Sequence, residues 1–210
     1  EGDMIRLLER EGLAFGADTN ASTSFSETNY RLDLPRNDPR LLDLALMLMR
    51  ETASELTFSE SAVEREKGVV LSEMRDRNNY SMRNLEDSMQ FQYPGSLYAN
   101  RLPIGTEQAL KSATAQSLKS FWAREYVPGH TIVVVIGDFD PALVEAKIRE
   151  RFADWGGPAP APQPKSGPVN FSDKGRDDLF IDPALPERTE VTRHGPWLGG
   201  TDTVAQRREN

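Results

Sequence analysis

The chain has 210 residues, of which 38% are hydrophobic and 28% are charged. This length lies between one and two average domains, and the composition is that of a folded chain. The net charge of −8 argues against a general nucleic-acid binder, which needs a basic surface. No apolar run approaches the ~20 residues of a membrane span. The lack of cysteine excludes disulfides, thiolate metal sites and cysteine nucleophiles.

Start and stop signals divide the first 155 residues into alternating helices and strands. Asp38-Pro39 and Asp140-Pro141 are N-cap pairs. The predicted helices cover 2–11, 39 to about 54, a long stretch from Ser59 or Ser61 to about Met89, two helices that start at Thr106 and Thr114, and 141–155. The predicted strands are 28–34 and the β-branched run Thr131–Ile136, which we expect to be buried.

The composition changes after residue 156. Residues 157–168 are rich in proline and glycine and predict a semi-rigid linker. Residues 169–210 contain strand-like pieces near 179–181 and 189–192 and the start of a helix. We expect an α+β fold with a layered mixed or antiparallel sheet and helices packed on it. Both ends of the sequence look cut, so we expect a fragment of a longer protein. Residues 1–156 are then part of one half of that protein, and residues 169–210 lead into its second half.

The most informative stretch is 64–77, EREKGVVLSEMRDR. Glu66 and Glu73 are seven residues apart and therefore share one helix face, with Val69 and Val70 between them. Carboxylates on an apolar stripe need a partner or a metal if they are buried. The alternative is that both reach water or pair locally, as Glu73 and Arg77 could at i, i+4.

A zinc site also needs further ligands, typically histidine. The chain has two histidines, His130 and His194, which are far apart in sequence and form no H-x-x-x-H pair. We interpret His130 as structural and His194 as a solvated loop residue.

Several stretches together resemble the pitrilysin/insulinase family of inverted-motif zinc peptidases. The resemblance covers about residues 2–155 and rests on pieces that come in the family's order. They are Glu66 and Glu73 in E-x-x-x-x-x-x-E, 16–23 (GADTNAST) followed by 27–30 (ETNY), 102–107 (LPIGTE) and 121–139 (FWAREYVPGHTIVVVIGDF).

The resemblance implies a pitrilysin-like metallohydrolase half that uses zinc to activate a water for peptide hydrolysis. Glu73 matches the family's third zinc ligand. Glu66 matches the acidic residue that orients a ligand or the water, which is its implied catalytic role. The family's other two ligands and its base come from an H-x-x-E-H helix, which this sequence lacks. We therefore expect this fragment alone to be inactive and unable to hold zinc, whether the motif precedes Glu1 or the parent lacks it.

The resemblance also implies that an extended peptide adds as a strand beside Asn20, Ala21, Ser22 and Thr23. The alternative for this segment is a polar edge strand that avoids aggregation. A second, similar half would close the chamber, and a bacterial periplasm or cell envelope is the family's suggestion for location.

Three hypotheses for function remain. The first is a fragment of a zinc metalloendopeptidase. The second is a non-catalytic, peptidase-like scaffold or peptide-binding subunit, which has less reason to keep both glutamates. The third is an unrelated α/β domain, which predicts that Glu66 and Glu73 point to solvent.

Overall fold

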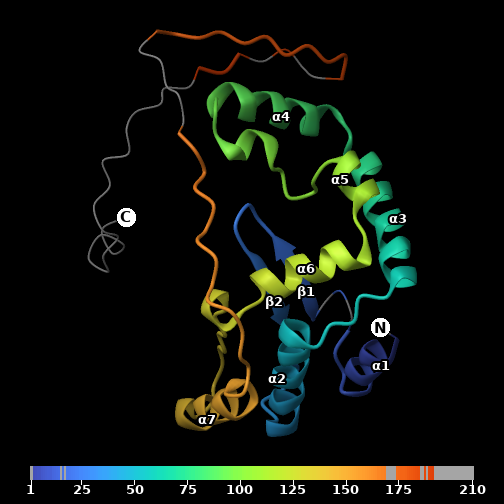
Figure 1. Cartoon of the computed structure of the whole chain (residues 1–210), viewed down its shortest axis with the longest axis vertical. Helices are drawn as coiled ribbons and strands as arrows, with labels where there is room; N and C mark the ends of the chain where they lie inside the picture. The colour runs from blue at the N-terminus through green and yellow to red at the C-terminus, as the bar shows by residue number, and fades with distance from the viewer. Residues whose placement is uncertain are drawn as a thin grey trace.

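The computed structural model describes residues 2–14, 16, 18–168, 174–184, 187 and 189–191. The described part is rich in helices, with one small antiparallel sheet (Figure 1). In chain order the elements are α1 (Gly2–Arg10), β1 (Thr19–Thr23), β2 (Thr28–Leu32), α2 (Pro39–Ser54), α3 (Glu60–Arg77), α4 (Tyr80–Gln92), the 3-10 turn η1 (Leu97–Asn100), α5 (Glu107–Ser112), α6 (Ala115–Glu125), the 3-10 turn η2 (Pro128–His130) and α7 (Pro141–Phe152).

The sheet is a hairpin of β1 and β2. Its register places Thr19 opposite Leu32 and Thr23 opposite Thr28. The expected α+β class is confirmed, with the layered sheet reduced to these two strands in the described part of the chain.

Most helix ends follow from local capping. The Asp38 carboxylate accepts a hydrogen bond from the backbone N–H of Arg40, and Asp140 caps α7 in the same way, both as predicted. The single long helix predicted from residue 59 to Met89 is wrong, because the chain breaks into α3 and α4 at residues 78–79. The Asn79 side chain accepts from the N–H groups of two following residues, which starts a new helix there. Ser59, not Ser61, is the cap of α3.

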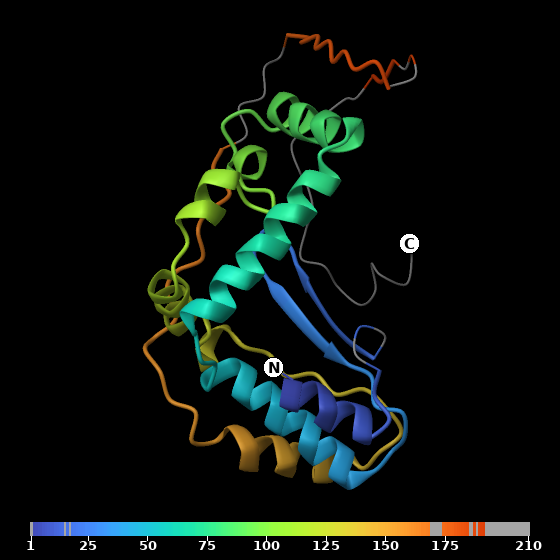
Figure 2. The same cartoon turned by 90° about the vertical axis from the view of Figure 1, so that its right-hand side faces the viewer.

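A hydrophobic core lies where α1 and α2 meet. Its buried side chains are Leu8, Leu13, Leu41 and Leu48, and Leu32 and Leu34 pack against them. The strand β2 therefore begins in solvent and ends in this core. On its other side α2 contacts α7, and Lys147 Nζ lies 2.6 Å from Asp43 Oδ1 between these helices. Figure 2 shows α1, α2 and α7 stacked at one end of the molecule and α3 extending away from them.

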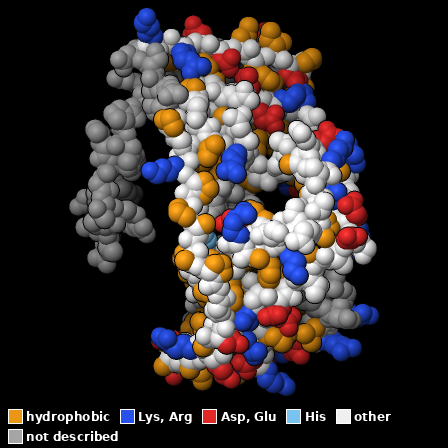
Figure 3. Space-filling model, viewed as in Figure 1, with side chains coloured by type: hydrophobic (Ala, Val, Ile, Leu, Met, Phe, Trp, Pro, Cys, Tyr) orange, Lys and Arg blue, Asp and Glu red, His pale blue; other side chains and the backbone are white. Residues whose placement is uncertain are grey.

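Much of the surface is uncovered. The chain exposes 16252 Å², whereas a compact monomer of 23.5 kDa exposes ~9800 Å². Figure 3 shows hydrophobic side chains among the charged ones on the viewed face, which is hollowed near its middle. An open arrangement of this kind leaves surfaces that other polypeptide can cover.

The predicted buried strand Thr131–Ile136 is the clearest difference from the sequence expectation. The segment is irregular, and Ile132, Val134 and Ile136 are 86%, 69% and 92% exposed. A β-branched run is buried only when neighbouring strands and helices cover both of its faces. Among the described residues no strand pairs with it.

The proline-rich segment 157–168 runs back from α7 toward η1 (Figure 1). Ala161 O lies 3.0 Å from His130 Nε2, and Ser166 O accepts a hydrogen bond of 2.7 Å from the N–H of Leu97. Of the strand-like pieces expected beyond the linker, 179–181 is irregular. His194 and the helix start near residue 202 lie outside the described residues.

Candidate functional site

The helix α3 carries the two glutamates that the sequence singles out. Ser59 caps its first turn, Glu60 lies in that turn, and Arg75 and Arg77 lie in the last turn. Acidic residues near the N-terminus and basic residues near the C-terminus both favour the helix through its dipole. The local sequence therefore specifies a stable helix through the whole span from Glu66 to Glu73.

Both glutamates reach solvent on this helix. The Glu66 side chain is 53% exposed and its Oε1 lies 3.3 Å from Arg65 Nε. The Glu73 side chain is 43% exposed and its Oε1 lies 2.5 Å from Arg77 Nη2. Val69 between them is 56% exposed and Val70 is half-buried, so the apolar stripe is only partly covered. Local pairing, the alternative recognised from the sequence, is the arrangement present in the structure.

The described residues do not form a complete metal site. No group of three or more His, Cys, Asp or Glu side chains within them could hold a metal ion. A carboxylate such as Glu73 can supply one oxygen ligand, but zinc in a catalytic site takes three protein ligands. The contacts of His130 are with other elements, since its Nδ1 lies 4.0 Å from Glu125 Oε2 and its Nε2 lies 3.0 Å from Ala161 O. The donor set for zinc is therefore incomplete in the described part of this chain.

Within the described part of the chain β1 pairs only with β2, so its other backbone edge is free there. Its residues 20–23 are all exposed. The backbone N–H of Ser24 donates to Glu27 O, and that of Asp33 donates to Asp18 O. In an antiparallel pair the residues that exchange these bonds alternate with residues whose N–H and C=O point outward. The even residues of β1 therefore bond to β2, and Thr19, Ala21 and Thr23 point their backbone groups away from it.

One of these outward groups is held by a neighbouring side chain. The Oδ1 atom of Asn20 accepts a hydrogen bond of 2.8 Å from the N–H of Ala21. The amide oxygen thus occupies the position that a carbonyl of an added strand would take. Sequence reasoning named Asn20 and Ala21 but not this contact, because it depends on which edge of β1 is free.

The structure keeps the two parts of the expected site separate. The hairpin and α3 lie apart in Figure 1. Among the described residues, each of the two glutamates forms its ion pair with an arginine of the same helix, and no hydrogen bond or ion pair joins either of them to β1. A complete site needs a further element between or beside them.

An aromatic contact that sequence reasoning missed positions the hairpin. The Tyr30 hydroxyl of β2 lies 2.7 Å from the Tyr126 hydroxyl at the end of α6. Burial raises the pKa of Tyr30 well above its usual range, and the hydrogen bond with Tyr126 raises this pKa further. Trp122 of α6 continues the contact, because its Nε1 donates 3.1 Å to Thr52 O at the end of α2. These links tie β2, α6 and α2 together.

Comparisons with known proteins place this geometry in a family. The sequence matches the family description Insulinase (Peptidase family M16) over residues 1–94 and Peptidase M16 inactive domain over residues 112–202. A zinc protease PQQL-like protein of Arabidopsis thaliana is 34% identical over 181 residues, which make up 86% of this chain and 19% of that protein. Zinc protease PqqE of Helicobacter pylori is 28% identical over 155 residues, or 72% of this chain and 33% of that protein.

A solved structure agrees with these matches. The first half of the periplasmic protease PqqL from Escherichia coli superposes with a TM-score of 0.74 at 28% identity, covering 79% of this chain and 35% of that chain. The chain thus spans a third or less of the two curated relatives described above. No described helix is long and apolar enough to cross a membrane. The two family matches, the relative that is 34% identical and the shared fold all agree. They show that the chain belongs to the insulinase family of peptidases, family M16.

Proposed function

We propose that this chain is part of the catalytic half of a zinc-dependent endopeptidase. The observation that carries the proposal is the pair Glu66 and Glu73 on one exposed face of α3, in a chain of the insulinase family. Half-exposed carboxylates remain available as ligands, since a metal ion can displace the arginine that Glu73 contacts. Zinc, when bound, would polarise a peptide carbonyl and acidify a bound water.

In this proposal the residues of the chain have distinct roles. Glu73 supplies one zinc ligand, and Glu66 orients a ligand or the water beside it. The remaining ligands and the base belong to an H-x-x-E-H segment that the sequence does not contain. A chain with one ligand of three does not hold zinc by itself, so we expect residues 1–210 to be inactive without that segment.

The free edge of β1 binds the peptide substrate. An extended peptide pairs with the outward backbone groups of Ala21 and Thr23, and Asn20 releases the Ala21 N–H to a substrate carbonyl. Pairing of this kind allows many substrate sequences, because its hydrogen bonds depend on the extended backbone of the peptide and not on its side chains. A second homologous half, as in relatives built from two halves, encloses the peptide. The periplasmic relative from Escherichia coli supports a periplasmic location.

Zinc content tests the metal role directly. We compare this chain with a longer protein that carries an H-x-x-E-H segment ahead of it, using mass spectrometry of dialysed protein. We expect about one zinc per chain in the longer protein only, and loss of that zinc in Glu73→Gln. Glu64→Gln is the matched control, because Glu64 lies on the same helix and pairs with Lys67. Zinc that remains bound in the Glu73→Gln variant contradicts the proposal. A lack of zinc in both proteins contradicts it as well.

A second candidate is a non-catalytic, peptide-binding scaffold. The observation that favours it is the free edge of β1, in a chain whose described residues contain no cluster of side chains that could hold a metal ion. The two candidates differ in their need for metal. A longer protein that binds an extended peptide equally well with and without a chelator, and that contains no zinc, supports the scaffold.

A further inference from the structure

The segment 157–168, GPAPAPQPKSGP, is restricted by its own covalent structure to an extended conformation. Prolines occupy every second position from Pro158 to Pro164, and each proline ring holds its own φ at about −65°. Each proline also disfavours the helical conformation for the residue before it. The segment therefore loses little conformational entropy when it docks on a surface, because few conformations are open to it beforehand.

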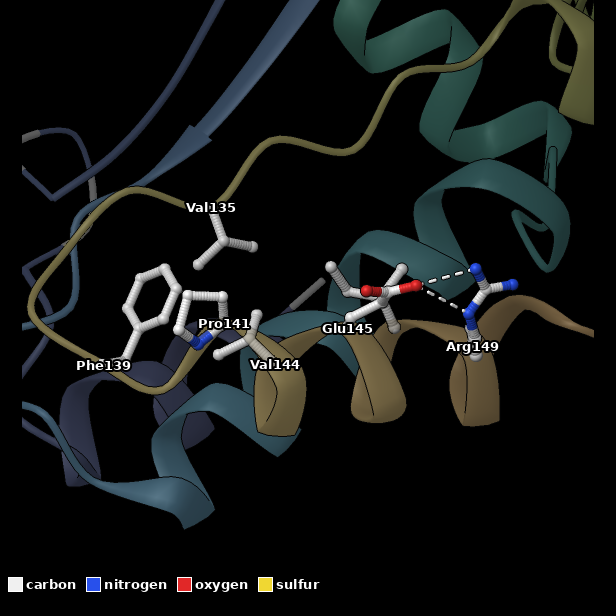
Figure 4. A pocket seen from close by; sticks show the side chains of 7 residues that line it. Val135, Phe139, Pro141, Val144, Glu145 and Arg149 are labelled. Carbon is white, nitrogen blue, oxygen red and sulfur yellow. Dashed lines mark hydrogen bonds and ion pairs between the residues drawn. The ribbon is translucent and has the colours of Figure 1, made fainter.

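The helix α7, which precedes the segment, is held by two other parts of the chain. Val135 and Phe139 line an apolar groove together with Val144 of α7 (Figure 4). Lys147 of α7 forms an ion pair with Asp43 of α2. These contacts hold α7, and with it the start of the segment, in place.

The first anchor of the segment is the turn η2. A Cβ atom added to Gly129 would lie 2.7 Å from Cγ and 2.9 Å from Cδ of Pro160, so the proline ring can come this close only because residue 129 is glycine. Beside this contact His130 Nε2 lies 3.0 Å from Ala161 O. The ring nitrogen is the donor, because a carbonyl oxygen can only accept. A ring contact and a hydrogen bond thus fix two neighbouring residues of the segment.

The second anchor is formed by the start of η1 and the residues just before it. The backbone N–H of Leu97 donates a hydrogen bond of 2.7 Å to Ser166 O. Gly167 has a φ of +84°, and a Cβ atom added to it would lie 3.1 Å from Gly95 O. Both the positive φ and the close approach favour glycine at position 167. Between the two anchors residues 162–165 are exposed, so the segment bridges from one anchor to the other.

We propose that residues 157–168 are a rigid strut docked on η2 and η1, and not a hinge. The polypeptide after residue 168 then starts from a fixed point beside η1, and movement relative to the first 156 residues takes place beyond the strut. The strut also braces the molecule, because it and α3 both run from the end that holds α2 and α7 toward the end that holds α4 (Figure 2). This role does not depend on zinc or on peptide binding.

A distance measurement between two spin labels tests the rigidity of the segment. The chain has no cysteine, so Gln163→Cys and Ser120→Cys place one label on the segment and one on α6, both at exposed positions. We expect one narrow distance distribution, and a broad one when Gly129→Val is added, because the valine displaces Pro160. Gly156→Val is the matched control, since a Cβ atom added there meets nothing within 4 Å. A broad distribution without Gly129→Val, or an unchanged one with it, overturns the proposal.

Trypsin digestion measures the release of the segment independently, because Lys165 is a cleavage site between the anchors. Cleavage follows the population of the released segment when release and docking are fast. We expect faster cleavage after Lys165 in Gly129→Val than in Gly156→Val. Replacing both Pro158 and Pro162 by alanine should raise cleavage roughly 4–25-fold, since each proline restricts the released segment by roughly 2–5-fold. This double variant decides the question if circular dichroism shows that Gly129→Val does not fold, and an unchanged cleavage rate in it overturns the proposal.

Discussion

Lysine 67 joins α3 to the end of α5, and removing its ammonium tests how that junction is held. Its Nζ donates to Ala113 O at 2.9 Å and to Lys111 O at 3.2 Å, and the side chain is only 15% exposed. Carbonyls at the end of a helix lack partners within the helix and carry its negative dipole end. The ammonium therefore satisfies two acceptors with a full positive charge.

The magnitude follows from these contacts. A hydrogen bond to a charged group contributes about 1.5–3 kcal/mol. Both carbonyls regain water when Lys67→Met removes the charge, so we expect a net loss of about 2 kcal/mol, or a roughly 30-fold change in the unfolding equilibrium. The third partner, Glu64, is 66% exposed and contributes little. For a chain of this size the loss lowers the melting temperature by about 4–8 °C.

Urea unfolding of three proteins measures this effect. Wild type, Lys67→Met and Glu64→Gln are followed by circular dichroism, and methionine keeps the apolar stem of the lysine. We expect a large shift for Lys67→Met and a shift below about 0.5 kcal/mol for Glu64→Gln. Equal shifts would mean that the surface ion pair and not the helix-end carbonyls holds the junction, which would refute the reasoning.

Two further predictions follow from local contacts. Thr114→Ala removes a reciprocal cap, in which the Thr114 hydroxyl accepts from the Ser117 N–H at 3.1 Å, and should cost about 1 kcal/mol in urea unfolding. An equally large loss for Thr57→Ala, an exposed threonine outside the helices that is not the cap of α3, would argue against that assignment. Tyr30 has a folded-state pKa above the usual tyrosine value, so its stabilising effect is complete below about pH 10 and is lost as the pH rises through the folded value. Absorbance at alkaline pH should show a late-ionising tyrosine that disappears in Tyr30→Phe, and an unchanged titration would contradict the Tyr30–Tyr126 contact.

Local chemistry in the sequence was sufficient to predict most helix starts. Asp38, Asp140, Thr106 and Thr114 all cap helices where expected, because a cap depends on residues within three positions of it. The shared face of Glu66 and Glu73 also follows from helix period alone. The break at Asn79 was missed, although its signal is local, because the apolar pattern continued across it.

The environment of each element depended on distant parts of the chain. Tyr30 meets Tyr126, which is 96 residues away in sequence, and no pattern within either strand or helix encodes that contact. The free edge of β1 likewise depends on its register with β2. This register decides that the backbone N–H and C=O groups of Ala21, and not those of Ser22, point away from β2.

The segment Ile132–Ile136 shows most clearly that the burial of a segment depends on distant parts of the chain. Its composition favours an extended, apolar strand, and this tendency is intrinsic to β-branched residues. Whether such a strand is buried is decided by what packs against it, and in the described part of this chain only one of its faces is covered. The family resemblance and the identity of the glutamates could be recognised from residues alone. Their exposure, the separation of α3 from the hairpin and the open strand face arise from tertiary packing, because burial is a property of neighbours and not of a segment.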